Sequence, residues 1–446
     1  MRNTPKTLLI CLILILTCNN TFSQENKKLK TINDIIEANI NNHRNIYTDL
    51  HRNPELSLME FETSKKMAAQ LRKLGFDVTE NVGGNGVVGV LKNGKGPTVM
   101  LRTDMDALPI SENTGLEYAS KVVMKNMEGQ EMPVMHACGH DMHMTLWLGT
   151  LTTLSGMQKE WNGTLVAIAQ PAEEISGGSS KMLADGLFSR FPTPDYALAY
   201  HVAPDIPAGK IGYSPGPIFA GVTNADIYVY GIGGHGALPQ TTIDPIVLSA
   251  HIISRLQTIV SREIDPVAPA VVTVGSIHGG TKHNIIPEEV KMQLTLRFFS
   301  DEVYRQIEES INRICEGEAL AAGVPAGKLP LVLIGDQYTP PVVNDPGLVN
   351  KAVLSMQEAL GEENIFRMNP ATVAEDFGKY GLTKENVKIA LFMCGSTEAA
   401  RYENTIKSGQ QMPGLHNPSY YPDFEPTYRA GVKAMSATIV DLFNNN

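Results

Sequence analysis

The sequence is poor in cysteine, with five among 446 residues. Two of these, Cys11 and Cys18, lie in or beside an apolar segment near the N-terminus, and those that follow are Cys138, Cys315 and Cys394. When the two cysteines near the N-terminus are set aside, three remain, and an odd number cannot all form pairs within the chain. Their spacing also resembles no disulfide framework. We therefore expect a core held by hydrophobic burial, for which 446 residues with 43% apolar content are ample.

Other features are missing as well. The chain has no internal repeat and no long low-complexity segment. Its net charge is −10, whereas a surface that binds a phosphate backbone needs an excess of lysine and arginine, so we expect no nucleic-acid partner. There is no H-E-x-x-H zinc motif, and GGSS at 177–180 is not the G-x-S-x-G turn of a serine nucleophile. GIGGHG at 231–236 matches the G-x-G-x-x-G of dinucleotide folds, but Pro239 disfavours the helix that should follow.

The apolar run at 8–16 is too short to span a bilayer. It follows two positive charges and precedes the small residues Thr21 and Ser23, which suit the −3 and −1 positions of a cleavage site. We interpret 1–23 as a signal peptide and expect an exported protein, periplasmic or extracellular. Two alternatives are less favoured: an uncleaved anchor, and a lipoprotein attached through Cys18, where the preceding residue is larger than usual.

Patterns of apolar residues divide the rest of the chain into two kinds of region. Strands alternate with helices in 31–219 and again in 339–446, which predicts a mixed or parallel sheet. Between them, residues 220–338 show the order β-α-β-β-α-β of a split ferredoxin-like motif. We predict an α/β protein with one mixed-sheet domain and a smaller α+β domain inserted into it. Among single elements, we expect helix at 31–75 and at 142–154.

The segment HACGHDMH, residues 136–143, concentrates three of the 11 histidines of the chain around one cysteine. Cys138 and His140 are two residues apart, and in a loop or strand end such side chains project to the same side. A thiolate and an imidazole placed in this way can share one metal ion or bridge two. Gly139 allows a tight turn between them. The alternative is a buried cysteine beside hydrogen-bonded histidines, without a metal.

Two pairs of acidic residues follow apolar strands. Asp104 and Asp106, in RTDMDALP, end a strand predicted to be buried, where carboxylates are costly unless they are paired or bind metal. One of them could orient a histidine ligand, and a turn-capping aspartate is the alternative. Glu173 and Glu174, in QPAEE, follow another strand, and adjacent side chains in extended backbone point in opposite directions. One could bind metal while the other acts as a general base; a solvated acidic loop is the alternative.

His201, in AYHVAP, and His416, in GLHNP, add two more candidates. A single histidine is more often structural than a metal ligand. Five candidates, mostly at strand ends of one sheet, are harder to explain in that way, because ligands of α/β sheets gather outside the carboxyl ends of the strands. The candidate metal ligands are Cys138, His140, Glu174, His201 and His416.

At these residues the sequence resembles the dinuclear-metal aminoacylase and carboxypeptidase family, peptidase family M20, in its amidohydrolase branch. That branch includes hippurate hydrolases, indole-acetyl-amino-acid hydrolases and N-acetyl-diaminopimelate deacetylases. The resemblance covers about residues 35–440 and rests on seven motifs in order: RTDMDALP, HACGHDMH, QPAEE, GGHGALP, HNIIPEEV, AEDF and GLHNP. Each motif is modest, but the ordered set is highly specific.

The resemblance implies two divalent metal ions, Zn²⁺ or Mn²⁺, held by the five candidate ligands. Glu173 matches the general acid/base, and Asp106 matches the residue that orients a ligand. In the inserted domain, His235 matches a histidine that stabilises the oxyanion, often in the site of a partner subunit. Asn284 matches a polar residue near the substrate, and Arg297 is a weaker candidate for binding the substrate carboxylate. The inserted domain of the family is a lid that also dimerises, so a homodimer is expected.

The expected function is metal-dependent hydrolysis of the amide bond in N-acyl amino acids or small peptides. The metal ions would activate a water molecule and polarise the scissile carbonyl. Glu173 would take the proton of the water and return it to the leaving amine. The alternative, from a different class, is a metal-dependent binding protein without turnover. Loss of Glu173 would be its signature, and Glu173 is present.

Overall fold

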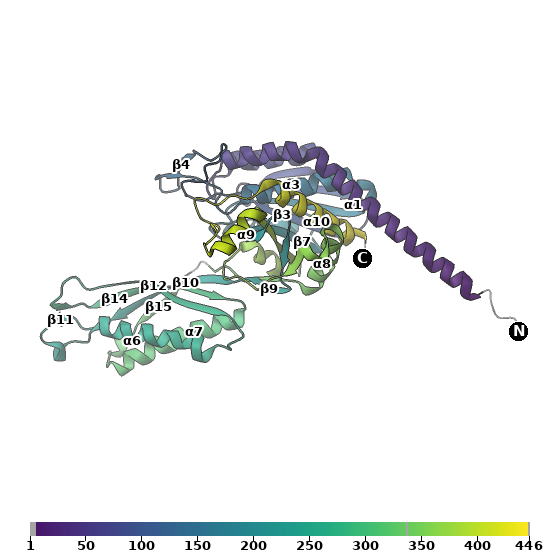
Figure 1. Ribbon diagram of the computed structural model, residues 1–446. Coiled ribbons are helices and arrows are strands. Elements are labelled where there is room, and N and C mark those ends of the chain that lie inside the picture. Colours follow the sequence, from purple (N-terminus) through teal and green to yellow (C-terminus); the bar gives the residue numbers. More distant parts are fainter. Residues whose placement is uncertain (1–5, 336–337, 445–446) are drawn as a thin grey trace. The chain divides into compact units, whose positions relative to one another are not determined.

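The computed structural model describes residues 6–335 and 338–444 (Figure 1). Its first helix, α1, spans Lys6–Arg52 and so includes most of the segment that we interpret as a signal peptide. Residues 1–5 of that segment lie outside the described residues. No helix among the described residues combines the length and the apolar character needed to cross a membrane.

The chain separates into two compact units. The small unit consists of Pro217–Val343 and Asn369–Lys379. The second of these segments belongs to it because the Ala220 amide donates to the carbonyls of Ala371 and Val373. The remaining residues form the large unit. The short strands β9 (Gly216–Phe219) and β16 (Val342–Asn344) stand where the chain passes between the units.

The large unit is built on a mixed sheet, which confirms the predicted α/β class. Among the described residues it has eight strands, in the order β1-β2-β6-β3-β7-β18-β8-β17. The adjacent strands β6, β3, β7 and β18 run parallel. By contrast, β1 is antiparallel to β2, β2 to β6, and β8 to β18. The strands are β1 (Asp77–Val82), β2 (Gly86–Asn93), β3 (Thr98–Asp104), β6 (Gly163–Gln170), β7 (Tyr196–Pro207), β8 (Ile211–Tyr213), β17 (Ile365–Arg367) and β18 (Lys388–Thr397).

The parallel strands are apolar on both faces because both faces are covered. Strands β3 and β6 are buried along almost their whole length, as expected for parallel strands in a covered sheet. Helices α1, α3, α8 and α10 pack against one another and share an apolar core with the sheet, whereas α2 packs on β1 and β2. The bounds are α2 (Phe61–Lys73), α3 (His140–Gly156), α4 (Gly178–Ala184), α5 (Leu187–Arg190), α8 (Pro346–Leu360), α9 (Ala399–Ser408), α10 (Phe424–Asn444), and the hairpin β4 (Val123–Lys125) and β5 (Glu131–Pro133).

Two helix predictions need correction. The region 31–75 is not one helix, because α1 ends at Arg52 and α2 begins only at Phe61. Pro54 disfavours helical backbone in the residue before it, which ends α1. The helix predicted at 142–154 begins earlier, at His140, so this histidine belongs to α3 rather than to a strand end or loop.

The small unit contains a four-stranded antiparallel sheet in the order β12-β14-β10-β15. Helices α6 and α7 pack on the sheet and bury an apolar core that includes Ile227, Ile252, Met292, Leu296 and Ile311. The order along the chain is the β-α-β-β-α-β pattern of a ferredoxin-like fold. The elements are β10 (Gly221–Tyr230), α6 (Pro245–Thr258), β12 (Ala270–Gly279), β14 (Glu289–Phe298), α7 (Asp301–Ala321) and β15 (Leu331–Ile334).

The GIGGHG segment does not form a dinucleotide-binding turn. Residues after β10 enter a short strand, β11 (Gly234–His235), which pairs with β13 (Ile285–Ile286). Helix α6 begins only at Pro245, nine residues beyond the last glycine of the motif. The segment therefore lacks the helix N-terminus on which a dinucleotide fold holds its pyrophosphate.

Candidate metal centre

The candidate site lies at the carboxyl ends of the adjacent strands β6 and β3, beside the middle of the neighbouring strand β7. Arg102 of β3 pairs with Ala199 of β7, so Asp104 and His201 lie at one level two residues further on. Strand β3 ends there, whereas β7 continues to Pro207. His201 is therefore inside a strand and not at its end, which corrects the sequence prediction. Its side chain nevertheless emerges where the neighbouring strand stops, at the edge where α/β sheets bind ligands.

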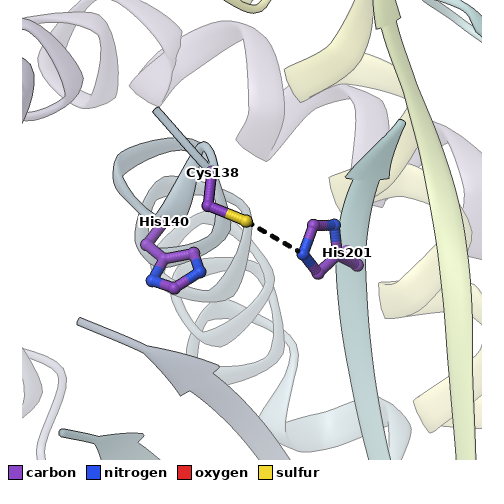
Figure 2. A group of neighbouring side chains, drawn as sticks. All are labelled: Cys138, His140 and His201. Carbon is purple, nitrogen blue, oxygen red and sulfur yellow. Dashed lines mark hydrogen bonds between the residues drawn. The ribbon is translucent and has the colours of Figure 1, made fainter. Parts of the chain in front are cut away.

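Cys138, His140 and His201 come together at this edge (Figure 2). Sγ of Cys138 lies 3.5 Å from Nε2 of His201, and the ligand atoms of all three buried residues lie within 4.8 Å of one another. Gly139 has a left-handed φ of 78°, which turns the chain between the thiol and the imidazole, as predicted. A Cβ at this position would stand 2.5 Å from Cγ2 of Val202, so only glycine fits.

Cys138, Glu174 and His416 form a second group within the same 4.8 Å limit. Nε2 of His416 lies 3.4 Å from Oε2 of Glu174. His416 has a φ of 61°, and its amide donates to the carbonyl of Ala137, which places it beside the cysteine. The side chain of His416 is 53% exposed, whereas that of Glu174 is 7% exposed. Since both groups contain Cys138, the five predicted ligands form one continuous set that could hold divalent cations.

Main-chain carbonyls orient the two buried histidines. Nδ1 of His140 lies 2.8 Å from the carbonyl oxygen of Asp106, and Nδ1 of His201 lies 2.8 Å from that of Val202. A carbonyl only accepts, so each Nδ1 carries a proton, and the lone pair of the ring lies on Nε2 whenever the ring is neutral. Within the described residues, Nε2 of His140 and Oε1 of Glu174 are buried and have no hydrogen-bond partner. Two buried acceptors without a donor fit a cation.

The pKa shifts of the site residues also indicate a site for a cation. Burial raises the pKa of Glu174 to about 7. Burial lowers the pKa of His140, but the carboxylates of Asp104, Asp106 and Glu174 outweigh burial and raise it to about 10. Burial holds the pKa of His201 well below its usual value. The acidic cluster thus draws a proton onto His140, and a divalent cation bound to the same atoms would replace that proton.

The two glutamates lie in a turn, which corrects the prediction of extended backbone. Strand β6 ends at Gln170, and the amides of Glu173 and Glu174 both donate to the carboxylate of Asp106 at 3.0 Å. The two side chains do not point in opposite directions. Oε2 of Glu173 and Oε1 of Glu174 each lie 3.8 Å from Nε2 of His140. Asp106 therefore orients His140 through its carbonyl and the glutamate turn through its carboxylate.

The third histidine of HACGHDMH has a supporting contact that sequence analysis missed. Nδ1 of His143 lies 2.8 Å from Oδ1 of Asp104, and Nε2 of His143 accepts from the amide of Val202 at 2.9 Å. The pair thereby holds the backbone next to His201. A signal was present, because His140 and His143 are three apart and so share one face of a helix.

The remaining predicted residues lie in the small unit. His235 pairs with Ile285 between β11 and β13, and the Gly236 amide donates to the carbonyl of Asn284 at 2.9 Å, so His235 and Asn284 lie together on exposed backbone. Arg297 is half-buried at the other end of β14. Arg297 lies twelve positions beyond Ile285 along mostly extended chain, roughly 35 Å at strand geometry. Within one small unit, Arg297 is therefore remote from the other two.

Comparison with known proteins places this geometry in a family. Peptidase family M20/M25/M40 matches residues 100–440. The chain is 36% identical over 370 residues to IAA-amino acid hydrolase ILR1-like 4 of Arabidopsis thaliana, covering 82% of this chain and 80% of that protein. It is 38% identical over 331 residues to the hippurate hydrolase of Campylobacter jejuni, covering 74% of this chain and 82% of that one.

Solved structures agree with these matches. A putative aminohydrolase from methicillin-resistant Staphylococcus aureus superposes with a TM-score of 0.81 at 29% identity, over 93% of this chain and 99% of that one. A dinuclear metal-binding peptidase of the M20 family from Bacillus subtilis superposes with a TM-score of 0.74 at 29% identity, over 92% of this chain and 100% of that one. The chain therefore belongs to peptidase family M20/M25/M40 and is a metal-dependent amidohydrolase.

Proposed function

We propose that the protein hydrolyses the amide bond of N-acyl amino acids or small peptides with the help of two divalent cations, Zn²⁺ or Mn²⁺. The observation that carries this proposal is the pair of ligand groups that share Cys138, next to the carboxylate of Glu173. Relatives named hippurate hydrolase, N-acetylcysteine deacetylase and N-acetyldiaminopimelate deacetylase support an acyl amino acid as substrate.

In this proposal Glu173 is the general acid and base. The cations, when bound, lower the pKa of a water molecule and polarise the scissile carbonyl. Glu173 accepts the proton of the attacking water and delivers it to the leaving amine. Its side chain is 8% exposed, and its own amide is held by Asp106, so the carboxylate has little freedom to leave the site. The cations would be held by Glu174, His140, His201, His416 and Cys138.

We assign the small unit to substrate recognition. His235 donates to the developing oxyanion, Asn284 contacts the substrate, and Arg297 pairs with a substrate carboxylate. A separation of roughly 35 Å along extended chain prevents one small unit from offering His235 and Arg297 to the same small substrate. This supports a homodimer in which the two residues that reach one site come from different subunits.

We also propose export through cleavage after Ser23. The support is the sequence pattern of a charged segment, a short apolar run and small residues at the cleavage site. N-terminal sequencing of protein secreted by its native host is expected to begin near Gln24. An intact N-terminal methionine, or a lipid on Cys18, would reject this cleavage site.

The experiment that tests the function is a substrate panel. Hippurate, N-acetyl amino acids, indole-acetyl amino acids and dipeptides are incubated with protein that has been stripped of metal and reloaded with Zn²⁺ or Mn²⁺. Hydrolysis of at least one N-acyl amino acid or dipeptide, dependent on the added metal, is the expected result. Metal binding without turnover of any substrate would favour the metal-dependent binding protein instead.

A further inference from the structure

Glu60 stands at the N-cap of α2, yet its side chain does not cap that helix. An acidic residue at a helix start ordinarily accepts from the free amides of the first turn. Here Glu55 performs that task, because its carboxylate accepts from the amides of Glu62 and Thr63 at 2.8–3.1 Å. Glu60 is instead fully buried, which is costly for a carboxylate without a strong reason.

The carboxylate of Glu60 faces the turn that carries Glu173 and Glu174. Its Oε1 accepts from the amide of Ala172 at 2.8 Å and from the amide of Leu58 at 2.9 Å. Its Oε2 accepts from the side-chain amide of Asn85 at 3.0 Å. Three donors thus hold both oxygens, and one of these donors is the residue immediately before Glu173.

Ala172 needs such a restraint. Its φ is 53°, a left-handed conformation that is unfavourable for a residue other than glycine. The amides of Ala172, Glu173 and Glu174 are consecutive, and two buried carboxylates accept all of them: Glu60 takes the first and Asp106 the next two. Burial, together with the nearby Asp106 carboxylate, raises the pKa of Glu60 to about 7, so the arrangement is unfavourable in charge and is kept by its hydrogen bonds.

We propose that Glu60 is a positioning residue for the hydrolytic reaction: by holding the Ala172 amide it fixes the turn that carries Glu173 and Glu174. The inference rests on the proposed function, in which Glu173 moves the proton and Glu174 holds metal. The carboxylate of Glu60 accepts from Leu58, Asn85 and Ala172, so we place it behind the turn, acting on Glu173 through the backbone. Its effect comes from reach, because only a side chain of this length brings an acceptor to Ala172.

Two substitutions separate reach from charge. Glu60→Gln keeps the reach and an acceptor oxygen but loses the charge, whereas Glu60→Asp keeps the charge and shortens the side chain by one methylene. We expect Glu60→Asp to lower kcat roughly 10- to 100-fold at saturating metal, with KM within about threefold, the usual cost of a lost supporting contact. We expect Glu60→Gln to retain at least about a third of the kcat. Glu55→Gln is the matched control and is expected to lower the melting temperature while leaving kcat unchanged.

A second readout needs neither metal nor substrate. Hydrogen–deuterium exchange of the metal-free protein is followed in peptides that cover residues 170–176. Glu60→Asp is expected to speed exchange in this segment, and Glu55→Gln is expected to leave it unchanged. If Glu60→Asp exchanges and turns over like the wild type, or if Glu60→Gln is impaired as strongly as Glu60→Asp, the positioning role is wrong. A wild type that hydrolyses no substrate sinks the proposed function, and the exchange data still decide whether Glu60 holds the turn.

Discussion

The metal centre of the large unit and the His235 segment of the small unit are built in opposite ways. Among the proposed ligands Cys138, His140 and His201 are buried, Glu174 is partly buried and His416 is exposed. Each buried histidine ligand has its second nitrogen on a main-chain carbonyl. His235 is exposed, and its Nδ1 accepts from the amide of Ala237 two residues further on. The side chains proposed to bind metal are thus held in place by hydrogen bonds before any cation binds. His235, which is proposed to contact the substrate, is held by one hydrogen bond to its own segment.

Removal of metal should expose this difference most strongly. Treatment with a strong chelator is expected to abolish hydrolysis, because the buried ligand cluster then has no cation to offset its acidic groups. Metal analysis of the reloaded protein should find close to two ions per chain. Folding of the small unit should be unaffected, since its described residues contain none of the proposed ligands. Full activity in the chelator, with no metal detected, would falsify the metalloenzyme proposal.

Substitution of the two glutamates should divide their roles. Glu173→Gln keeps the shape of the side chain and removes the base, so kcat should fall by about 10²–10⁴ while both ions remain. Glu174→Gln should instead weaken metal binding, by roughly tenfold or more in apparent affinity. Both variants are assayed for kcat and for bound metal after the same dialysis. Equal loss of metal in the two would show that our assignment of roles is wrong.

Loss of the exposed imidazole should cost less and leave the metal in place. His235→Ala is expected to lower kcat by about 10²–10³, the usual cost of one oxyanion donor, without a change in metal content or melting temperature. His278→Ala is a suitable control, since this histidine is also exposed and lies on β12 of the same unit.

Mixed subunits can show whether His235 acts across the proposed dimer. Chains carrying His235→Ala are mixed with inactive chains carrying Glu173→Gln, and subunit exchange is verified independently. If His235 acts in the partner site, one site of each mixed dimer has both residues intact, and activity should rise above that of either variant alone. No recovery would assign His235 to the site of its own chain.

The smallest expected effect concerns a buried histidine that pairs with Asp141 of α3, the residue after the proposed ligand His140. His51 lies near the end of α1. Its Nδ1 is 2.6 Å from Oδ2 of Asp141, and its Nε2 is 3.0 Å from Oε1 of Glu112. Burial lowers the pKa of His51, but these two carboxylates outweigh burial and raise it to about 9. A folded pKa above the unfolded value of about 6.5 gives a stabilisation that is complete below pH 6.5 and is lost as the pH rises through 9.

The stability advantage of the wild type over His51→Gln should therefore shrink by up to about 3 kcal/mol between pH 6 and pH 10. Denaturant unfolding of metal-free protein at several pH values measures it. His43→Gln is the control, because burial lowers the pKa of His43 to about 4 and this histidine stays neutral throughout that range. An advantage of constant size across the range would mean that the His51 pair is not charged as inferred.

The sequence was sufficient to predict candidate site residues that lie in short motifs. Cys138, His140 and His201 could be proposed because a thiol and imidazoles at strand ends have few other uses, and the structure brings these three together. The spacing argument for them was nevertheless incomplete, because His140 is the first residue of a helix. The left-handed backbone of Gly139 brings its imidazole close to the thiol of Cys138. The chemistry of these residues was predictable here, and their local backbone only in part.

Contacts between distant segments were beyond reach. Glu60 and Ala172 are separated by 112 positions, and nothing near either residue indicates that they meet. The opposite directions expected for Glu173 and Glu174 failed for a related reason, because the carboxylate of Asp106 folds their backbone into a turn. The alternation of side chains holds only in extended backbone. Here the turn is formed with a residue that lies elsewhere in the sequence, Asp106.

The exposed position of His416 has a consequence for how the protein keeps its ions. The group formed by Cys138, His140 and His201 is buried, whereas the group that includes His416 is partly exposed to solvent. If the two proposed cations bind to these groups, the cation beside His416 should exchange faster, because water reaches its ligands more easily. Mild washing should then leave a half-loaded protein, and the ion added last would determine which metal completes the active enzyme.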